Sequence, residues 1–372
     1  MAKKKERVSE APLTTVRKTV RNLYRNYQLF KRANSAAHVV RVNVPEARVF
    51  SGSYLISSEK GVFGIVGGQM FRLTQTDTFG LAVRNGELFV ACSTDIYSTI
   101  SKCSLPQKIE PGAKLYFKEI FRIPIEKAGR IHQIGFYNDT LAVTETSTNS
   151  IVFLNPSSGE IISEFSPFRD AFGEIIGDDH NHINSLSQCG ECLLICAYRA
   201  GRGSLIGVVH NNRMKGYPTK NVGVHDVYLS GKTLYFSDTF GDRSTGNERG
   251  FLMANNCPVG IEFFDKAPGF AVRGMAQQGQ EMILGHSHKG PRSKRFKGKG
   301  ALFRLINGKV VENVKIPFAQ VYDIVGLNGD HFDVPPALTT WDEINRHLET
   351  VLGPSIYEFR DSSKMGTPRI DE

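Results

Sequence analysis

Residues 224–252 of this chain read VHDVYLSGKTLYFSDTFGDRSTGNERGFL. The segment opens with a short alternating strand, turns at a polar pair, and continues as a second β-rich strand that ends in a polar loop. Two earlier segments have the same form: IHQIGFYNDTLAVTETSTNSIVFLN at 131–155 and NHINSLSQCGECLLICAYRAGRGSLIGVV at 181–209. A histidine stands at each opening, and His132, His182 and His225 are separated by 50 and 43 residues. The chain is therefore predicted to be a repeat protein.

Weaker copies of this opening extend the repeat in both directions. They begin near Gly80, Arg273 and Tyr322, so that successive openings lie 52, 50, 43, 48 and 49 residues apart. Periods of roughly 40 to 50 residues with several short strands each are typical of β-propellers. A parallel α/β fold would need helical crossovers, and no helical pattern is present between Gly80 and Phe318. The sequence predicts an all-β fold, a six-bladed β-propeller.

The last opening is followed by a helical-looking tail, so its blade lacks strands. Suitable strands are present near the N-terminus: SGSYLISSEK, GVFGIVGGQ and FRLTQ. We expect the ring to close by pairing these strands with the strand at 321–327, because closure removes exposed sheet edges. The predicted organisation is a basic amphipathic helical extension at 1–40, the propeller at 45–335 and a C-terminal helical tail at 336–372. The tail contains TTWDEINRHLETVLG, a short capped helix that ends at Gly353.

The chain is basic, with a formal net charge of +9 over 372 residues. Apolar side chains at helical spacing, Leu13, Val16 and Val20 among them, predict that the N-terminal helix packs on the outside of the propeller. The alternative is contact of its basic face with an anionic membrane surface or a protein. Specific nucleic-acid binding is not predicted. A second basic run is KGPRSKRFKGKG at 289–300. It is interpreted equally as a solvated connecting loop or as a positively charged loop that attracts anionic ligands.

Neither a membrane span nor a secretory signal is evident, because apolar stretches of the required length are missing from the sequence. A cytoplasmic location is therefore the expectation. The six cysteines agree with it. Cys189 and Cys192 form CGEC, which is interpreted as a hairpin turn rather than a redox or metal pair. His286 and His288 are expected two residues apart on the second strand of the fifth blade, with exposed loop histidines as the alternative. His331 is expected at a surface or packing position.

The strand openings are the best clue to function. In propellers the first strand of each blade lines the central channel, so residues at the openings converge on the axis. This places His132, His182, His225, Arg273 and Asp323 around one funnel. Small or apolar residues would fill a channel more cheaply, so three histidines at the same phase of consecutive blades predict a site.

Neighbouring residues extend this site. Asn184 lies two residues after His182 and is expected on the same side of its strand, and Arg199 lies on the return strand. These segments, between about residues 129 and 243, resemble arylsulfate sulfotransferases, whose propeller channel holds histidines, a His-x-Asn pair and an arginine on the following strand. The resemblance implies that His225 is the nucleophile that carries a sulfuryl group. It also implies that His132, His182, Asn184 and Arg199 stabilise the developing negative charge. The strand openings also resemble gluconolactonase-type propellers more loosely.

First principles support this chemistry. A neutral imidazole is a competent nucleophile near neutral pH, and sulfuryl or phosphoryl transfer needs cationic and N–H donors around the group. Arg273 is a further candidate for such a donor. The substrate is accordingly predicted to be an anionic small molecule or a glycan.

Two alternatives remain open from sequence. His132, His182 and His225 are also a suitable ligand set for a divalent metal, which would make the protein a metal-dependent lyase, hydrolase or oxygenase. The run GDDHNHIN adds further potential ligands: Asp178, Asp179 and His180. The second alternative is a non-catalytic propeller that binds a glycan or protein partner across its face. The sequence does not identify a cofactor, and a divalent metal ion is the candidate.

Overall fold

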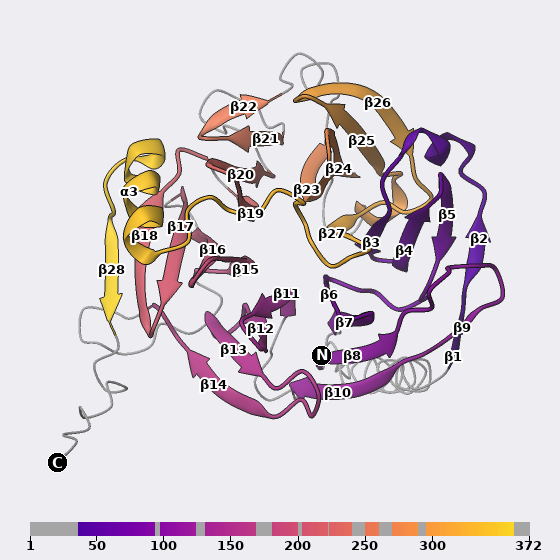
Figure 1. The fold of residues 1–372 in the computed structure, drawn as a ribbon, viewed down its shortest axis with the longest axis horizontal. Coiled ribbons are helices and arrows are strands. Elements are labelled where there is room, and N and C mark those ends of the chain that lie inside the picture. Colours follow the sequence, from indigo (N-terminus) through magenta and orange to yellow (C-terminus); the bar gives the residue numbers. More distant parts are fainter. Residues whose placement is uncertain are drawn as a thin grey trace, which may run out of the picture.

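The computed structural model describes residues 36–93, 97–123, 131–168, 181–199, 203–221, 223–239, 250–259, 270–288 and 295–360. Within these ranges, six antiparallel sheets of four or five strands are arranged around a central axis (Figure 1). The all-β, six-bladed propeller predicted from the repeat spacing is confirmed. Most of the predicted N-terminal extension lies outside the described residues.

The blades are numbered by their innermost strands along the chain. Blade 1 contains β6 (Gly80–Arg84), β7 (Glu87–Ser93), β8 (Ser98–Ser104) and β10 (Lys118–Ile123). Blade 2 contains β11 (Ile131–Tyr137), β12 (Thr140–Glu145), β13 (Ser150–Leu154) and β14 (Ile161–Phe165). Blade 3 contains β15 (Ile183–Cys189), β16 (Cys192–Arg199), β17 (Gly203–His210), β18 (Arg213–Pro218) and, at its edge, β28 (Tyr357–Arg360).

Blade 4 contains β19 (Val224–Ser230), β20 (Thr233–Asp238), β21 (Phe251–Ala254) and β22 (Cys257–Val259). Blade 5 contains β23 (Phe270–Gln278), β24 (Glu281–His288), β25 (Ala301–Ile306) and β26 (Lys309–Lys315). Blade 6 contains β27 (Val321–Gly326), β3 (Tyr54–Ser58), β4 (Gly61–Val66), β5 (Gln69–Arg72) and β2 (Val40–Val42). A separate pair joins β1 (Ala36–His38) to β9 (Lys114–Tyr116), and two 3-10 turns cover Pro45–Val49 and Arg295–Lys297.

Blade 6 combines strands from distant parts of the sequence. Its innermost strand β27 pairs antiparallel with β3, with Val321 opposite Ser58 and Ile324 opposite Ile56. The other strands of the blade come from residues 40–72, so this blade brings an early and a late part of the chain into one sheet. The pairing gives β3 a neighbour on each side, which leaves neither of its edges open.

The C-terminal part of the described chain crosses one face of the ring. After β27, the chain passes β23 and β19 and reaches blade 3 (Figure 1), with Gly231 N–H donating to Pro335 O on the way. The helix α3 (Trp341–Leu352) follows, with Thr340 as its N-cap in a capping box and Gly353 as its C-cap. The capped helix predicted from sequence is therefore confirmed. The tail is not helical throughout, because β28 extends blade 3 as a fifth strand.

Apolar side chains fill the spaces between neighbouring blades. The largest cluster joins blades 3, 4 and 5 and reaches the helix α3 through Trp341, Ile344 and Leu348. Burial of these side chains is what holds each blade against the next, since each sheet alone exposes both faces. In the described part of the chain, no helix has the length and apolarity needed to cross a membrane.

Candidate functional site

The predicted openings coincide with the starts of the innermost strands. Near their starts, the strands β11, β19, β23 and β27 carry His132, His225, Arg273 and Tyr322, respectively. His182 directly precedes β15. Because all innermost strands enter the ring from the same side, these residues gather at one end of the axis, which we call the channel mouth. The imidazole rings of His132 and His182 are in contact, with ring centroids 4.6 Å apart.

Backbone irregularities occur at these strand openings. In five of the six blades formed by the described residues, the register between the innermost strand and its partner shifts near the opening. The shifts lie at the positions of His132, Asn184, Asp226, Arg273 and Tyr322. A β-bulge re-aims the side chain that it carries, and bulges are enriched next to functional sites. The simple alternation expected from sequence for β15 therefore does not apply at its start.

Two residues at the mouth also have left-handed backbone. His182 has a φ of 44° and Asp226 a φ of 53°, a conformation that is uncommon for residues other than glycine. At the position of β23 that corresponds to Asp226, Gly274 has a φ of 71°. The strain at His182 is held in place by Asn149, whose Oδ1 accepts from the backbone N–H groups of Asn181 and His182.

His225 is the most buried of the three histidines, with 5% of its surface exposed. Its Nδ1 lies 2.9 Å from Gly223 O and 2.8 Å from Thr239 Oγ1. A carbonyl oxygen only accepts, so this contact assigns the ring proton to Nδ1 and leaves a lone pair on Nε2. Nε2 is buried and has no hydrogen-bond partner among the described residues.

The electrostatics of the mouth keep this imidazole neutral. Burial lowers the pKa of His225 well below its usual value. The nearby Arg273 guanidinium and the rings of His132 and His182 lower it further. His225 therefore presents an unprotonated, buried nitrogen at neutral pH.

Asn184 connects β15 to the neighbouring opening. Its Nδ2 donates to Val224 O at 3.0 Å, the carbonyl that directly precedes His225. This bond fixes the amide orientation, and Oδ1 is then a second buried acceptor without a hydrogen-bond partner among the described residues. Asn184 is 4% exposed. The side chain of Arg199 and the residues Asp178, Asp179 and His180 lie outside the described part of the structure.

Aromatic rings follow the rim of the mouth from blade to blade. Tyr322 stacks on Phe79 with centroids 4.5 Å apart, and Phe79 meets the edge of His132 at 5.9 Å. The row continues through His182 to Tyr198, whose ring centroids are 6.3 Å apart. All five rings are partly exposed. We call this set, Tyr322, Phe79, His132, His182 and Tyr198, the aromatic rim.

Deeper in the channel, polar side chains join one blade to the next. Asp323 Oδ2 accepts from Leu81 N–H, Gln133 Oε1 accepts from Leu186 N–H, and Asp226 Oδ2 accepts from Gly274 N–H. Each bond runs from the innermost strand of one blade to the innermost strand of another. Burial and the proximity of Asp323 raise the pKa of Asp226 to about 6. These residues are structural links. The sequence placed Asp323 at the funnel but gave no sign that Asp323, Gln133 and Asp226 bond to neighbouring blades.

The far end of the channel is closed by the chain segment that follows β27. His331 Nε2 lies 3.3 Å from Asp323 Oδ1, and its ring stacks on Tyr228 with centroids 4.4 Å apart. Gln133 Nε2 donates to both Tyr228 Oη and Asp323 Oδ1. A cavity of about 510 Å³ adjoins this network. The sequence left His331 as an isolated residue, whereas the structure makes it part of the channel.

A further histidine, His286, lies on the strand predicted for it, but it is buried rather than exposed. His286 lies on β24 and is 3% exposed, with its ring 4.4 Å from that of Phe303. Burial lowers its pKa to about 3. It is a neutral packing residue rather than an exposed loop histidine.

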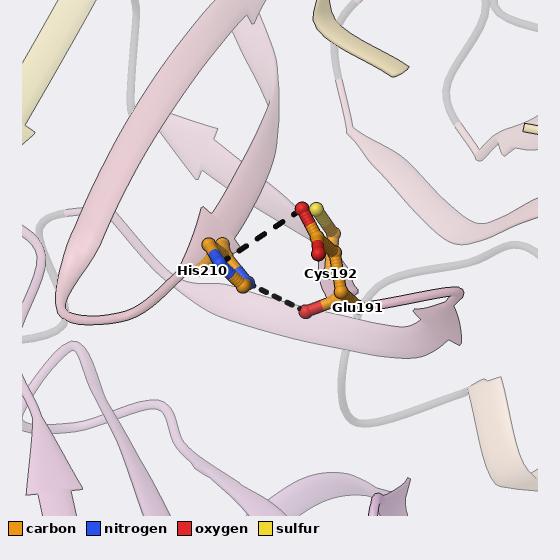
Figure 2. Close-up of side chains that lie close together, drawn as sticks. All are labelled: Glu191, Cys192 and His210. Carbon is orange, nitrogen blue, oxygen red and sulfur yellow. Dashed lines mark hydrogen bonds and ion pairs between the residues drawn. The ribbon is translucent and has the colours of Figure 1, made fainter. Parts of the chain in front are cut away.

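Figure 2 shows the group of potential metal ligands whose donor atoms lie within 4.8 Å of one another in the described residues: Glu191, Cys192 and His210. His210 Nδ1 lies 2.7 Å from Glu191 O, and its Nε2 lies 2.7 Å from Asn211 Nδ2. Glu191 Oε1 accepts from the N–H of Trp341 at the start of α3. Burial raises the pKa of Cys192 to about 12. Both imidazole nitrogens of His210 are hydrogen-bonded and the Cys192 thiol is protonated. The cluster is structural, because Glu191 attaches α3 to blade 3.

The same hairpin accounts for CGEC. Cys189 and Cys192 are opposite each other at the turn between β15 and β16, and both are free thiols. The interpretation as a hairpin turn is therefore confirmed. Among the described residues, the ring nitrogens of His132, His182 and His225 do not all lie within 4.8 Å of one another.

Comparisons with known proteins find similar solved structures but no similar sequence. No protein-family model matches the chain, and no curated protein matches it. Similar solved structures include a protein of unknown function from Bacteroides caccae, at 12% identity and a TM-score of 0.48, covering 74% of this chain and 98% of that one. The nidogen/laminin complex matches at 11% identity and 0.47, covering 74% and 97%. A luciferin-regenerating enzyme matches at 11% identity and 0.45, covering 78% and 84%.

The chain is a six-bladed β-propeller in which the rings of His132 and His182, at the starts of neighbouring blades, are in contact. At such low identities the comparisons carry no argument about activity. The resemblance to arylsulfate sulfotransferases rests on the sequence motifs alone.

Proposed function

We propose that the channel mouth is the active site of an enzyme that transfers a sulfuryl or phosphoryl group from an anionic substrate. The observation that carries this proposal is the Nε2 lone pair of His225, which is buried, unprotonated and without a partner among the described residues. Perturbed, buried groups in a channel are candidates for catalysis, because a buried polar atom without a partner is costly to maintain.

In the proposed reaction, His225 Nε2 attacks the sulfur or phosphorus atom of an ester. The new N–S or N–P bond forms as the ester O–S or O–P bond breaks, and the leaving oxygen keeps the electron pair. The oxygen of an acceptor hydroxyl then bonds to the sulfur or phosphorus atom as the N–S or N–P bond breaks. Its proton passes to the leaving-group oxygen or to water, and the neutral imidazole is released. Arg273, His132 and His182 would stabilise the equatorial oxygens, and Arg199 would join them as the family resemblance implies.

The substitution His225→Asn tests this role. The amide nitrogen of asparagine can replace Nδ1–H as the donor to Gly223 O, while the Nε2 lone pair is lost. Release of nitrophenolate from nitrophenyl sulfate and nitrophenyl phosphate would be measured for both proteins. We expect a loss on the order of a thousandfold, as for removal of a catalytic nucleophile. His38→Asn, at an exposed position, is the matched control.

Mass spectrometry of the quenched enzyme adds a direct readout. A sulfuryl or phosphoryl adduct on His225 supports the covalent route. Full activity in the His225→Asn protein would refute the proposal, and would leave a glycan- or protein-binding propeller as the remaining reading.

A divalent metal bound by His132, His182 and His225 is the second candidate. The observation that favours it is that Asn184 Oδ1 and His225 Nε2 are both buried without a hydrogen-bond partner among the described residues, since both atoms would accept a cation. Elemental analysis of the purified protein and of alanine variants at the three histidines tests it. Stoichiometric metal that is lost in the variants would replace the covalent route, whereas metal bound equally by all of them would eliminate this candidate.

A further inference from the structure

We infer that the ligand held at the channel mouth is a carbohydrate, which the aromatic rim and the two unpartnered acceptors contact together. This inference rests on the proposed function in that it names the substrate class of the same site. The transferred group would then be carried by, or delivered to, a sugar hydroxyl.

The aromatic rim supplies the apolar half of such a site. Its rings form a continuous row across blades 6, 1, 2 and 3, from Tyr322 through Phe79 and His132 to Tyr198. All of them keep part of their surface open, although each would bury more area in the core. The C–H face of a pyranose is flat and weakly positive, so it packs on the negative face of an aromatic ring. Ligand sites generally combine such a wall with a few polar groups.

The acceptors supply the polar half. Asn184 Oδ1 and His225 Nε2 each offer a lone pair and no proton, because their partner atoms Nδ2 and Nδ1 donate to Val224 O and Gly223 O. A sulfate or a carboxylate is itself an acceptor at neutral pH and satisfies neither atom. Sugar hydroxyls donate, and neighbouring hydroxyls on one ring would reach acceptors on adjacent strands. The pair therefore adds recognition of hydroxyl groups to the site of the proposed transfer reaction.

The two acceptors belong to one seam between blades. The bond from Asn184 Nδ2 to Val224 O ties β15 to the residue before His225. At the far end of the channel the polar atoms bond to one another instead, as Gln133, Tyr228, Asp323 and His331 do. The mouth is therefore where a hydroxylated ligand gains hydrogen bonds without displacing existing ones.

Saturation-transfer NMR and calorimetry with four sugars test the inference: glucuronate, glucose 6-sulfate, N-acetylglucosamine and mannose. Cyclohexanecarboxylate is the matched probe, because it has the ring size and charge of glucuronate without hydroxyls. We expect binding of at least one sugar and none of cyclohexanecarboxylate. Phe79→Leu and His225→Asn should each weaken that binding about tenfold or more, the effect of losing one ring contact or one hydrogen bond to a buried acceptor.

Tyr116→Leu, an aromatic substitution at a 69% exposed position on β9, is the control and should leave binding unchanged. Failure of all four sugars to bind, equal binding of cyclohexanecarboxylate, or sugar binding that survives both mouth substitutions would overturn the inference. Sugar binding without sulfuryl or phosphoryl transfer would overturn the proposed reaction alone. Transfer to or from nitrophenyl esters without sugar binding would overturn the carbohydrate inference alone.

Discussion

Asp226 provides a quantitative test of how the channel is built. Its carboxyl group is 3% exposed, and Oδ2 accepts from Gly274 N–H and from Ser237 Oγ–H, both at 2.8 Å. Burial is the main cause that raises its pKa from 3.8 to about 6, and Asp323 adds to it. The substitution Asp226→Asn keeps an acceptor oxygen for both donors and removes the charge.

The sign of the effect follows from this raised pKa. Below pH 3.8 the carboxyl is protonated in both the folded and the unfolded chain, so its full contribution to stability is present. That contribution is lost as the pH rises through about 6, because the folded protein must then hold a buried charge. The difference between 3.8 and about 6 corresponds to about 3 kcal/mol. At neutral pH, Asp226→Asn should therefore be more stable than the wild type by up to about 3 kcal/mol.

Urea unfolding at a series of pH values between acid and neutral measures this difference. Comparing the two proteins at each pH cancels the titration of every group that does not interact with Asp226. The stability difference should be near zero at the acid end and grow through the window between 3.8 and about 6. Asp139→Asn, at an exposed turn, is the control for the loss of a carboxylate elsewhere on the ring. A difference that does not vary with pH, or a variant less stable at neutral pH, would show that the buried carboxylate carries no such cost.

Three further outcomes are expected. Gln133→Leu leaves the buried Leu186 N–H without its acceptor and should lower the free energy of unfolding by about 3 kcal/mol. Gln188→Leu, at an exposed position, should lower it much less, and chemical denaturation measures both. A thiol-reactive dye should titrate the exposed Cys257 first in the native protein, the half-buried Cys92 more slowly, and the four buried cysteines after unfolding. Rapid reaction of more than two thiols would contradict the described burial. Thr340→Ala removes the side-chain cap of α3 and should cost about 1 kcal/mol in thermal unfolding, and an unchanged melting temperature would show that the cap contributes nothing.

Several parts of the site depend on local backbone that no periodic pattern encodes. Alternation of side chains predicted that His182 and Asn184 share one side of a strand, but His182 has left-handed backbone and a register shift follows it. The same is true of Asp226, which the sequence presented only as the neighbour of His225. A bulge depends on how two strands pair, so its position becomes visible only when both strands are in place.

The amino-acid sequence by itself determined the architecture of this protein. Repeat spacings of 43 to 52 residues, alternating strands and the capped helix at the C-terminus are local signals, and each specifies its element without reference to the rest of the chain. Tertiary structure alone decided which polar atoms meet. Examples are the contact of His331 with Asp323 and the attachment of α3 through Glu191. The acceptor atoms left without partners on Asn184 and His225 are also visible only in the folded structure. Such partners are set by packing around a common axis, and packing depends on every blade at once.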